Sequence, residues 1–276
     1  STYYKEEFGF EGRRTILTFG LLNPNKGVEV GIDAMERVVK EFPDSLYIVL
    51  GATHPNIKKD RGEEYRVSLK RRVNEKNLQD NVVFHDQFVP REELIKYLVS
   101  ADIYMTPYRS KEQISSGTLA YAVSMGKAVI STPYWYAQEL LDNGRGRLVP
   151  FDDSDALAEN LIDLLGDEKT RQRMRKKAYE YGRDMVWNEV AKAYLKLFEE
   201  VEERYEEQIA KDIISQVSPS KTQITELPDV KLDHLRNMTD GTGIFQHATF
   251  TVPNRMHGYT TDDNARAALA MLKHWK

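Results

Sequence analysis

One lysine of this sequence lies at a junction that favours an anionic ligand. Residues 20–27, GLLNPNKG, follow a short apolar run, and Lys26 lies where a helical pattern begins. Cations are usually disfavoured there, because the N-terminal end of the helix dipole is positive. A bound anion would offset that repulsion. A solvent-exposed lysine in a turn is the simpler alternative, and this loop by itself leaves it open.

A second loop offers hydroxyls and free backbone amides to the same kind of ligand. Residues 108–118, YRSKEQISSGT, lead into a helix of small and apolar residues. Ser116 and Thr118 supply hydroxyls, Gly117 lets a ligand approach the backbone, and the unpaired amides of a helix start favour an anion. A serine N-cap alone does not need this succession, so we expect a phosphate-binding segment.

The two loops together predict a diphosphate site, because both follow strands, and parallel sheets bind ligands outside the carboxyl ends of their strands. Neither loop has the G-x4-G-K-[ST] motif of P-loop proteins or the G-x-G-x-x-G motif of dinucleotide-binding dehydrogenases.

Strands that alternate with helices must position these loops. Apolar runs predict strands over 14–20, 46–51, 82–84, 102–107, 128–132 and 146–150. Helical spacing predicts helices over 26–42, 63–78, 91–100 and 117–125. This alternation predicts an α/β fold, with a parallel sheet that is covered by helices on both faces.

After residue 150 the pattern is all-helical. Helices are expected over 155–165, capped by Asp153 or Ser154, then over 169–184 and 187–208. We interpret the acidic run at 199–207 as a solvated helix face. We divide the chain into a domain of residues 1–208, a linker of 209–231 that includes a Ser/Thr/Pro-rich stretch, and a short, mostly helical segment of 232–276.

Composition excludes several classes of function. The chain has 276 residues, 41% of them hydrophobic, which supports a packed core and excludes disorder as the main state. The absence of cysteine excludes disulfide scaffolds, cysteine zinc sites and thiol catalysis. A net charge of −4 gives no sign of nucleic-acid binding. No apolar run approaches the ~20 residues of a membrane helix, and no signal peptide is present, so we expect a cytoplasmic protein without a transmembrane segment.

Both ends of the sequence indicate a piece of a larger protein. It starts with STYYKEE, without an initiator methionine, and it stops at MLKHWK, inside a helical pattern that has no cap.

Several segments resemble the motifs of family-four (group 1) glycosyltransferases. Residues 19–27 are similar to the family's G-R-L-x-x-x-K-G segment, and 101–130 to its aD-x4-P-S…E-x7-E-A-x-A-x-G-x-P-V-I block. Glu139 and residues 146–150 are similar to its p-E-x-v…G-x-L-V-p close. The order and spacing over 14–198 resemble the carboxy-terminal half of a GT-B protein. The resemblance implies a Rossmann-like, donor-binding domain, followed by the start of an appended helical domain.

The resemblance also implies roles for the matching residues. Lys26 matches the lysine that grips the donor diphosphate, and Gln113, with Glu112 beside it, falls where a glutamate contacts the donor sugar. These three form the expected catalytic set. Phe88 falls where the family packs the nucleotide base, although it could equally lie in the core. The expected donor-binding residues are Gly20, Phe88, Val89, Ser116, Gly117, Thr118, Tyr121 and Glu139, of which Glu139 could orient a loop instead.

Two positions depart from the family pattern. Leu21 falls where an arginine accompanies the lysine, and Tyr121 falls where a glutamate holds the nucleotide ribose. The diphosphate cradle is therefore retained, and the ribose clamp is altered.

The function that the resemblance implies is retaining transfer of a hexose, such as mannose or glucose, from a nucleotide-diphosphate sugar to an acceptor glycan. Lys26 and the helix-start amides would stabilise the leaving diphosphate without a metal or another cofactor. Residues 153–155 spell D-x-D, but helix capping explains them and we reject a metal site. The acceptor is expected on a missing amino-terminal domain, so this chain is expected to bind the donor and to transfer poorly alone.

The last segment is polar and aromatic, as sugar-binding loops often are. Asp262 and Asp263 could act in acid–base chemistry, but two facing carboxylates are needed, so we expect Asp262 to cap a helix that starts at Asn264. His247 and His257 are too far apart in sequence for a local metal motif.

Two other functions stay open. The changes at Leu21 and Tyr121 could mark a degenerate, non-catalytic module that binds a glycan or a partner. A sugar-nucleotide epimerase of the same architecture is the second alternative. It is less favoured, because the segment around Lys26 and Gly27 is closer to the transferases.

Overall fold

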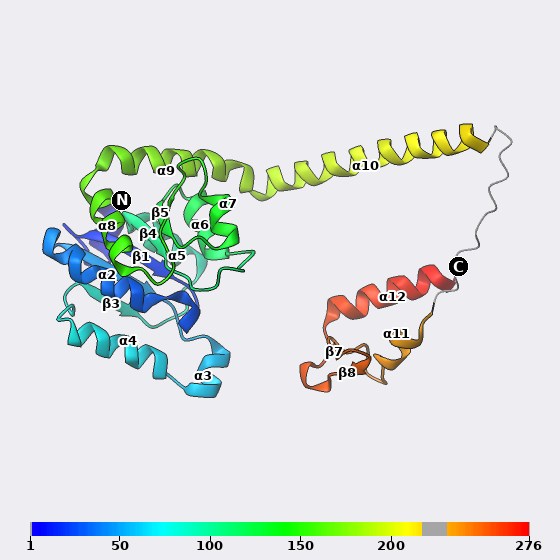
Figure 1. The fold of residues 1–276 in the computed structure, drawn as a ribbon, viewed down its shortest axis with the longest axis horizontal. Helices are drawn as coiled ribbons and strands as arrows, with labels where there is room; N and C mark the ends of the chain where they lie inside the picture. Colours follow the sequence, from blue (N-terminus) through cyan, green and yellow to red (C-terminus); the bar gives the residue numbers. More distant parts are fainter. Residues whose placement is uncertain (1, 217–230, 276) are drawn as a thin grey trace. The chain divides into compact units, whose positions relative to one another are not determined.

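The structure is a computed structural model that describes residues 2–216 and 231–275. It contains two compact units, one up to Tyr205 and one beyond it, and each is described by itself (Figure 1). The division of the chain into residues 1–208, 209–231 and 232–276 stays a prediction.

The first unit is built on a parallel sheet of six strands in the order β3-β2-β1-β4-β5-β6 (Figure 1). Their bounds are Arg14–Phe19 for β1, Ser45–Leu50 for β2, Val82–His85 for β3, Ile103–Thr106 for β4, Ala128–Ser131 for β5 and Arg147–Leu148 for β6. All six strands lie where the apolar runs predict them. The strand order reverses between β1 and β4, so a crevice opens where the loops after these two strands diverge.

Helices cover both faces of this sheet, which confirms the expected α/β architecture. Successive residues of a strand face opposite sides, so Ile16 of β1 packs into one core and Leu17 into the other. The first core lies under α2 (Val28–Glu41), α4 (Glu64–Glu75) and α8 (Ser154–Gly166). The second core lies under α5 (Arg91–Ser100), α6 (Gly117–Ser124) and α7 (Trp135–Leu140).

Several short elements escape the sequence patterns. They are α1 (Thr2–Glu7), the 3-10 helix η1 (Pro24–Lys26), α3 (Pro55–Arg61), α7 and the 3-10 helix η2 (Arg183–Met185). Two turns or fewer give too little periodicity to recognise. The helix expected from Lys26 starts at Val28 instead, because Gly27 between η1 and α2 has a left-handed φ of 59°. Glu139 lies inside α7, one residue before this helix ends.

Three helices, α8, α9 and α10, follow the last strand of the sheet. Asp153 caps α8 by accepting a hydrogen bond from the Ala156 amide at 2.8 Å, as expected, and α9 spans Glu168–Gly182. Helix α10 spans Trp187–Gln216, so the end predicted at residue 208 is wrong and the first part of the expected linker is helical. The rest of that linker, 217–230, lies outside the described residues.

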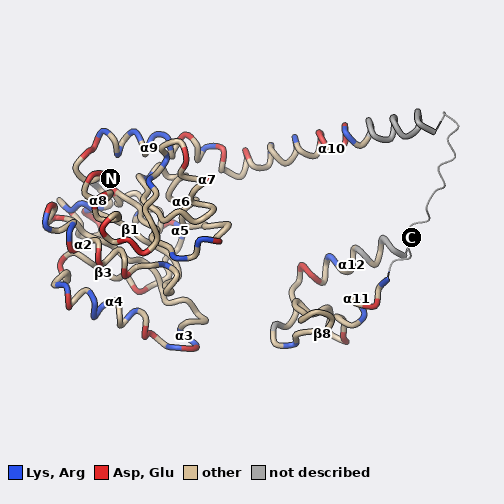
Figure 2. Tube along the Cα trace, viewed as in Figure 1, with Lys and Arg blue, Asp and Glu red and all other residues tan. Residues whose placement is uncertain are grey.

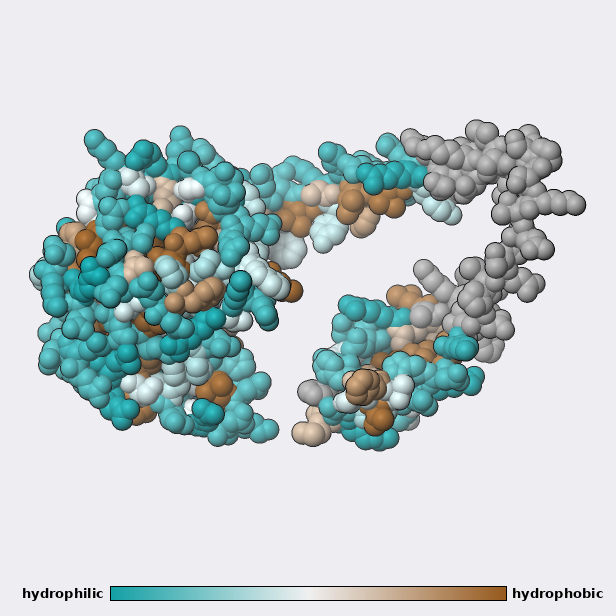
Figure 3. All heavy atoms as spheres, viewed as in Figure 1, coloured by the Kyte–Doolittle hydropathy of each residue, from teal (hydrophilic) through white to brown (hydrophobic). Residues whose placement is uncertain are grey.

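Acidic residues recur along α10 (Figure 2). The expected solvated face is confirmed for Glu199, Glu202 and Glu203, which are exposed, whereas the side chains of 206–207 lie outside the described residues. Apolar side chains of this helix are exposed as well, and they form a hydrophobic stretch along it (Figure 3). Phe198 is 58% and Val201 55% exposed.

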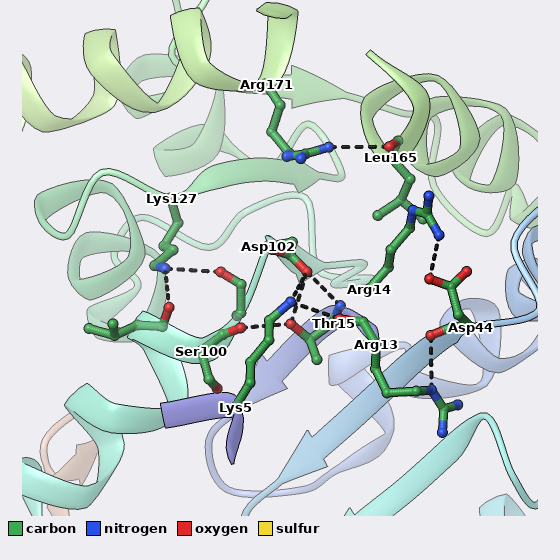
Figure 4. Close-up of polar contacts among 12 residues, drawn as sticks. Lys5, Arg13, Arg14, Thr15, Asp44, Ser100, Asp102, Lys127, Leu165 and Arg171 are labelled. Atoms are coloured by element: carbon green, nitrogen blue, oxygen red, sulfur yellow. Dashed lines mark hydrogen bonds and ion pairs between the residues drawn. The ribbon is translucent and has the colours of Figure 1, made fainter. Parts of the chain in front are cut away.

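A polar network joins the elements at the amino-terminal edge of the sheet (Figure 4). Asp102, just before β4, accepts hydrogen bonds from Lys5 Nζ at 2.6 Å and from the Thr15 amide at 2.8 Å. Burial alone would raise the pKa of Asp102, but these bonds hold it below its usual range. Lys127, just before β5, donates to the carbonyl oxygens of Val99 at 3.2 Å and Ala101 at 2.9 Å.

The second unit holds α11 (Asp233–Asn237), the antiparallel strands β7 (Ala248–Thr249) and β8 (Val252–Pro253), the 3-10 helix η3 (Arg255–His257) and α12 (Thr261–Trp275). The expectation that Asp262 caps this last helix is wrong. Thr260 Oγ1 accepts from the Asp263 amide at 3.4 Å, while Asp262 lies in the first turn and pairs with Arg266 at 3.3 Å. Within the described residues of both units, no helix combines the length and apolar character that crossing a bilayer requires.

Candidate functional site

The loops that follow β1 and β4 meet at the carboxyl edge of the sheet. Asn23 shapes the first loop, because its side chain accepts from the Asn25 amide at 3.0 Å and caps η1. Gly27 lets this loop pack against the end of β4: a Cβ there would lie 2.0 Å from the Pro107 carbonyl oxygen. The Arg109 amide also donates to the Asn25 carbonyl at 2.9 Å. The fold therefore brings the two predicted anion-binding loops side by side.

Lys26 lies at this junction and reaches across to the second loop. Its Nζ donates to the Tyr108 hydroxyl at 2.5 Å and lies 4.0 Å from the centroid of that ring. None of the ion pairs among the described residues includes Lys26. Burial lowers its pKa from 10.5 to about 8. The simpler alternative of a solvent-exposed turn lysine is therefore wrong, and this site holds a cation that no carboxylate neutralises.

Two hydroxyls at the start of α6 extend a row of polar groups from the Tyr108 hydroxyl. Thr118 Oγ1 lies 2.7 Å from the Tyr108 hydroxyl and 3.1 Å from Ser116 Oγ. Ser116 also accepts from the Leu119 amide at 3.3 Å, so it is an N-cap as well as a member of this row. A Cβ at Gly117 would meet no heavy atom within 4 Å, so the helix start is open to a ligand.

An apolar pocket of about 400 Å³ adjoins the helix start. Phe19, Leu21, Leu50 and Leu94 contribute its apolar walls. Six of the eight expected donor-binding residues also line it: Gly20, Phe88, Val89, Gly117, Thr118 and Tyr121. Phe88 is 82% exposed, which excludes the alternative that it lies in the core. The pocket offers flat and apolar contacts beside the phosphate-binding groups, as an aromatic base requires.

Lys26 and Ser116 lie beside this pocket through their contacts with Tyr108 and Thr118, but three other expected site residues lie neither in the pocket nor in that row. Glu112 is exposed in the loop before α6, and Gln113 Nε2 donates to the Ser115 carbonyl of the same loop at 2.9 Å. Glu139 is exposed on α7, and its carbonyl accepts from Arg145 at 2.8 Å. None of the three lines the pocket.

The D-x-D spelling at 153–155 belongs to the capped start of α8. Asp153 is engaged as the cap, and Asp155 pairs with Arg37 at 2.8 Å. In the part of the chain that the structure describes, no group of three or more His, Asp or Glu side chains is placed to hold a metal ion.

Sequence reasoning missed Tyr108, which contacts both predicted loops. Its side chain is 1% exposed, and its ring stacks on Tyr134 with the centroids 5.3 Å apart. Its place directly after Pro107, at the carboxyl end of β4, was the available signal. A buried aromatic residue beside a strand end usually indicates core packing, so only the structure shows that its hydroxyl reaches Lys26.

Comparison with known proteins bears on this geometry. The sequence profile of the family described as glycosyl transferases group 1 matches residues 2–181, which is more than half of the chain. The chain is 29% identical over 190 residues to a phosphatidyl-myo-inositol mannosyltransferase of Mycolicibacterium smegmatis, a match that covers 68% of this chain and 45% of that protein. It is 26% identical over 176 residues to a GDP-mannose-dependent alpha-(1-6)-phosphatidylinositol monomannoside mannosyltransferase of the same organism, covering 62% and 43%. The chain thus spans less than half the length of these two relatives.

Solved structures agree with the fold. The C-terminal domain of a glycosyl transferase group 1 family protein from Francisella tularensis is similar with a TM-score of 0.57 and 22% identity, and the match covers 65% of this chain and 89% of that domain. Anabaena HepE, solved in complex with UDP and glucose, is similar with a TM-score of 0.62 and 18% identity, covering 72% and 51%. At these identities the likeness concerns the fold alone.

Proposed function

Because this chain belongs to the group 1 glycosyl transferases and has the fold of their carboxy-terminal GT-B domain, we propose that it binds the nucleotide-diphosphate sugar of a retaining hexosyltransferase. One observation carries the proposal. Lys26 and the row of hydroxyls at the start of α6 converge beside an apolar pocket of about 400 Å³. This arrangement suits a diphosphate that is followed by an aromatic base.

In this proposal the domain stabilises the leaving group. The bond between the anomeric carbon and the phosphate oxygen breaks, and negative charge develops on the diphosphate. The Lys26 ammonium and the open amides around Gly117 are fixed beside that charge, so they need little reorganisation during the reaction. An acceptor hydroxyl forms the new bond to the anomeric carbon, and its proton passes to an oxygen of the departing diphosphate.

The donor that we propose to test first is GDP-mannose. The two mycobacterial relatives are named as mannosyltransferases, and one of them is named as GDP-mannose-dependent. The pocket is lined by Leu21 and Tyr121 rather than by an arginine and a carboxylate at these places. We expect the base to contribute most of the nucleoside's affinity through stacking, and the ribose hydroxyls to contribute less.

Calorimetric titration with GDP-mannose, UDP-glucose and ADP-glucose tests this proposal. We expect one donor to bind clearly more tightly than the others, and Lys26→Met to weaken it. Lys40→Met is the matched control, because Lys40 is exposed near the opposite end of α2 and its loss changes the net charge equally. Absence of binding by all three donors, or equal affinity in Lys26→Met and wild type, would refute the site assignment.

The proposal extends to conditions and partners. We propose that donor binding needs no metal or other cofactor, that a preceding amino-terminal domain holds the acceptor glycan, and that the reaction takes place in the cytoplasm. Donor affinity should therefore be unchanged by EDTA. Glucose release or transfer assays on this chain alone should show little turnover, and co-expression with residues from upstream of Ser1 should raise it.

The same titration separates the other two functions. Binding of glycans on an array without binding of any nucleotide sugar would favour a degenerate binding module. Conversion of one nucleotide sugar into its epimer, without an acceptor, would favour the epimerase.

A further inference from the structure

The Tyr108 hydroxyl occupies an unusual position between the two arms of the proposed diphosphate site. It lies 2.5 Å from Lys26 Nζ, which belongs to the loop after β1, and 2.7 Å from Thr118 Oγ1, which belongs to α6. The row continues to Ser116 Oγ at 3.1 Å. One phenol hydroxyl therefore connects the cation to the hydroxyls at the helix start.

The charge of Lys26 determines which group donates and which accepts in each hydrogen bond of this row. An ammonium group has three donors and no acceptor, so the Tyr108 oxygen must accept from Lys26. The single proton of the phenol is then free to go to Thr118 Oγ1, and the Thr118 proton is passed towards Ser116 or towards a ligand. Ser116 Oγ already accepts from the Leu119 amide, so its own proton is also free to point outwards.

A neutral lysine would remove this constraint. The uncharged amine can accept a hydrogen bond from Tyr108, which reverses the row and turns Thr118 and Ser116 lone pairs towards the ligand. Burial lowers the pKa of Lys26 to about 8, so this change falls within a range that experiments reach easily.

We propose that Tyr108 is a positioning residue that couples the protonation of Lys26 to the orientation of the Thr118 and Ser116 hydroxyls, so that these two hydroxyls turn their protons towards a diphosphate while Lys26 is charged. This inference rests on the proposed function of the site as a diphosphate cradle. It assigns a role to Tyr108, which acts through its contacts with Lys26 and Thr118 and to which the family resemblance assigns no role.

No other group near the row changes charge in the same pH range. Tyr104 on β4 and Tyr134 beside α7 are fully buried, and burial raises the pKa of both, to about 12 for Tyr134. Burial also raises the pKa of Tyr108 itself. On the far side of the loop, Glu29 and Arg109 pair with each other. Between pH 7 and 9.5 the titration of this cluster is therefore that of Lys26.

The experiment compares two conservative variants of neighbouring rings. Tyr108→Phe removes the connecting hydroxyl and keeps the stack. Tyr134→Phe is the matched control for the pKa of Lys26, because it removes a buried hydroxyl from the other ring of the stack, near Ser116 at the far end of the row. Lysine labelled with 13C at Cε reports the pKa of Lys26 in the ligand-free chain, and Lys26→Met assigns the signal.

We expect Tyr108→Phe to lower the pKa of Lys26 by about 0.5–1 unit, because the ammonium loses its acceptor. With GDP as the probe, calorimetry should show an affinity at pH 7 that is about five- to tenfold weaker, and a decline with rising pH that begins earlier. Thr118→Val should weaken GDP binding without moving the pKa of Lys26. Tyr134→Phe should leave the pKa of Lys26 at its wild-type value.

Equal pKa values of Lys26 in Tyr108→Phe and wild type would overturn the inference, as would an unchanged pH profile of GDP binding. The lysine titration needs no ligand. If the wild type binds no nucleotide at all, the proposed function fails, while the coupling between Tyr108 and Lys26 is still tested.

Discussion

Lys127 is buried and Lys26 is half-buried, and this desolvation lowers the pKa of each, but the two lysines lie at opposite edges of the sheet. Lys127 precedes β5 and donates to two backbone carbonyls, with a pKa of about 7. Lys26 follows β1 and donates to one phenol hydroxyl, with a pKa of about 8. The first lysine satisfies the backbone around it, whereas the second has ammonium hydrogens left for a ligand.

The polar groups around Lys127 are satisfied within the protein, whereas some of those around Lys26 are open to a ligand. At the amino-terminal edge, Asp102 is fully engaged by Lys5 and Thr15, and Arg13 donates to the carbonyl oxygens of Asp44, Ser45 and Asp80. At the carboxyl edge the helix start at Gly117 is open, and no carboxylate pairs with Lys26 among the described residues. One edge of this sheet is thus closed by internal hydrogen bonds, whereas the other leaves a cation and helix-start amides available, as the proposed binding site requires.

The largest effect is expected at the closed edge. Asp102→Ala should lower the free energy of unfolding by about 3 kcal/mol, because the half-buried Lys5 ammonium loses its carboxylate and keeps only the Arg13 carbonyl, while the Thr15 amide loses its acceptor. Urea denaturation measures this, with Asp184→Ala at an exposed position as the control. Nucleotide affinity of the folded variant should be unchanged, and a selective loss of affinity instead would break the comparison.

Exchanging the two lysines for methionine should give opposite results. Lys26→Met should weaken diphosphate binding about 10- to 100-fold and leave stability equal or higher, because a half-buried ammonium is removed. Lys127→Met should lower the free energy of unfolding by about 1–3 kcal/mol, because two carbonyls lose their donor, and should keep nucleotide affinity. Calorimetry measures the affinity and urea denaturation the free energy of unfolding of both variants. The comparison fails if both variants lose affinity, or if both lose stability.

Raising the pH should move stability and affinity in opposite directions. The folded-state pKa values of Lys26 and Lys127, about 8 and about 7, lie below the ordinary value of 10.5, so the unfolded chain binds more protons between these limits. Stability should therefore rise from pH 7 to 9.5, while GDP affinity falls as Lys26 loses its charge. Each methionine variant should show a smaller rise of stability with pH than the wild type. A wild-type stability that falls from pH 7 to 9.5 would contradict both lowered lysine pKa values.

The smallest effect is expected at Gly117. A methyl group there meets no protein atom within 4 Å, so Gly117→Ala should raise the free energy of unfolding by about 0.5 kcal/mol. The same methyl group lies beside the pocket and should weaken GDP binding roughly threefold. Gly241→Ala in the second unit also meets open space and serves as the control, because it should leave GDP binding unchanged. Tighter binding by Gly117→Ala would show that the helix start does not face the ligand.

Much of the fold and part of the site could be predicted from local patterns. Strand 45–50 is a nearly continuous apolar run, because both of its faces are buried, and strand 14–19 is buried over all but its first residue. The rule that ligands bind beyond strand ends then selected the loops of Lys26 and Ser116, and the structure places them together. Short helices such as α3 and α7 escaped prediction, because one or two turns carry too little periodicity.

The sequence by itself determined the order of strands and helices, and with it the loops that could meet a phosphate, because these depend on residues that are neighbours in the chain. Only the tertiary structure decided what those residues do. Lys5 meets Asp102 across 97 positions and Lys26 meets Tyr108 across 82. Packing between distant segments therefore decided that the Lys5 ammonium pairs with a carboxylate, whereas the Lys26 ammonium donates to a neutral hydroxyl. Burial and hydrogen bonding act through space, and a linear pattern does not report them.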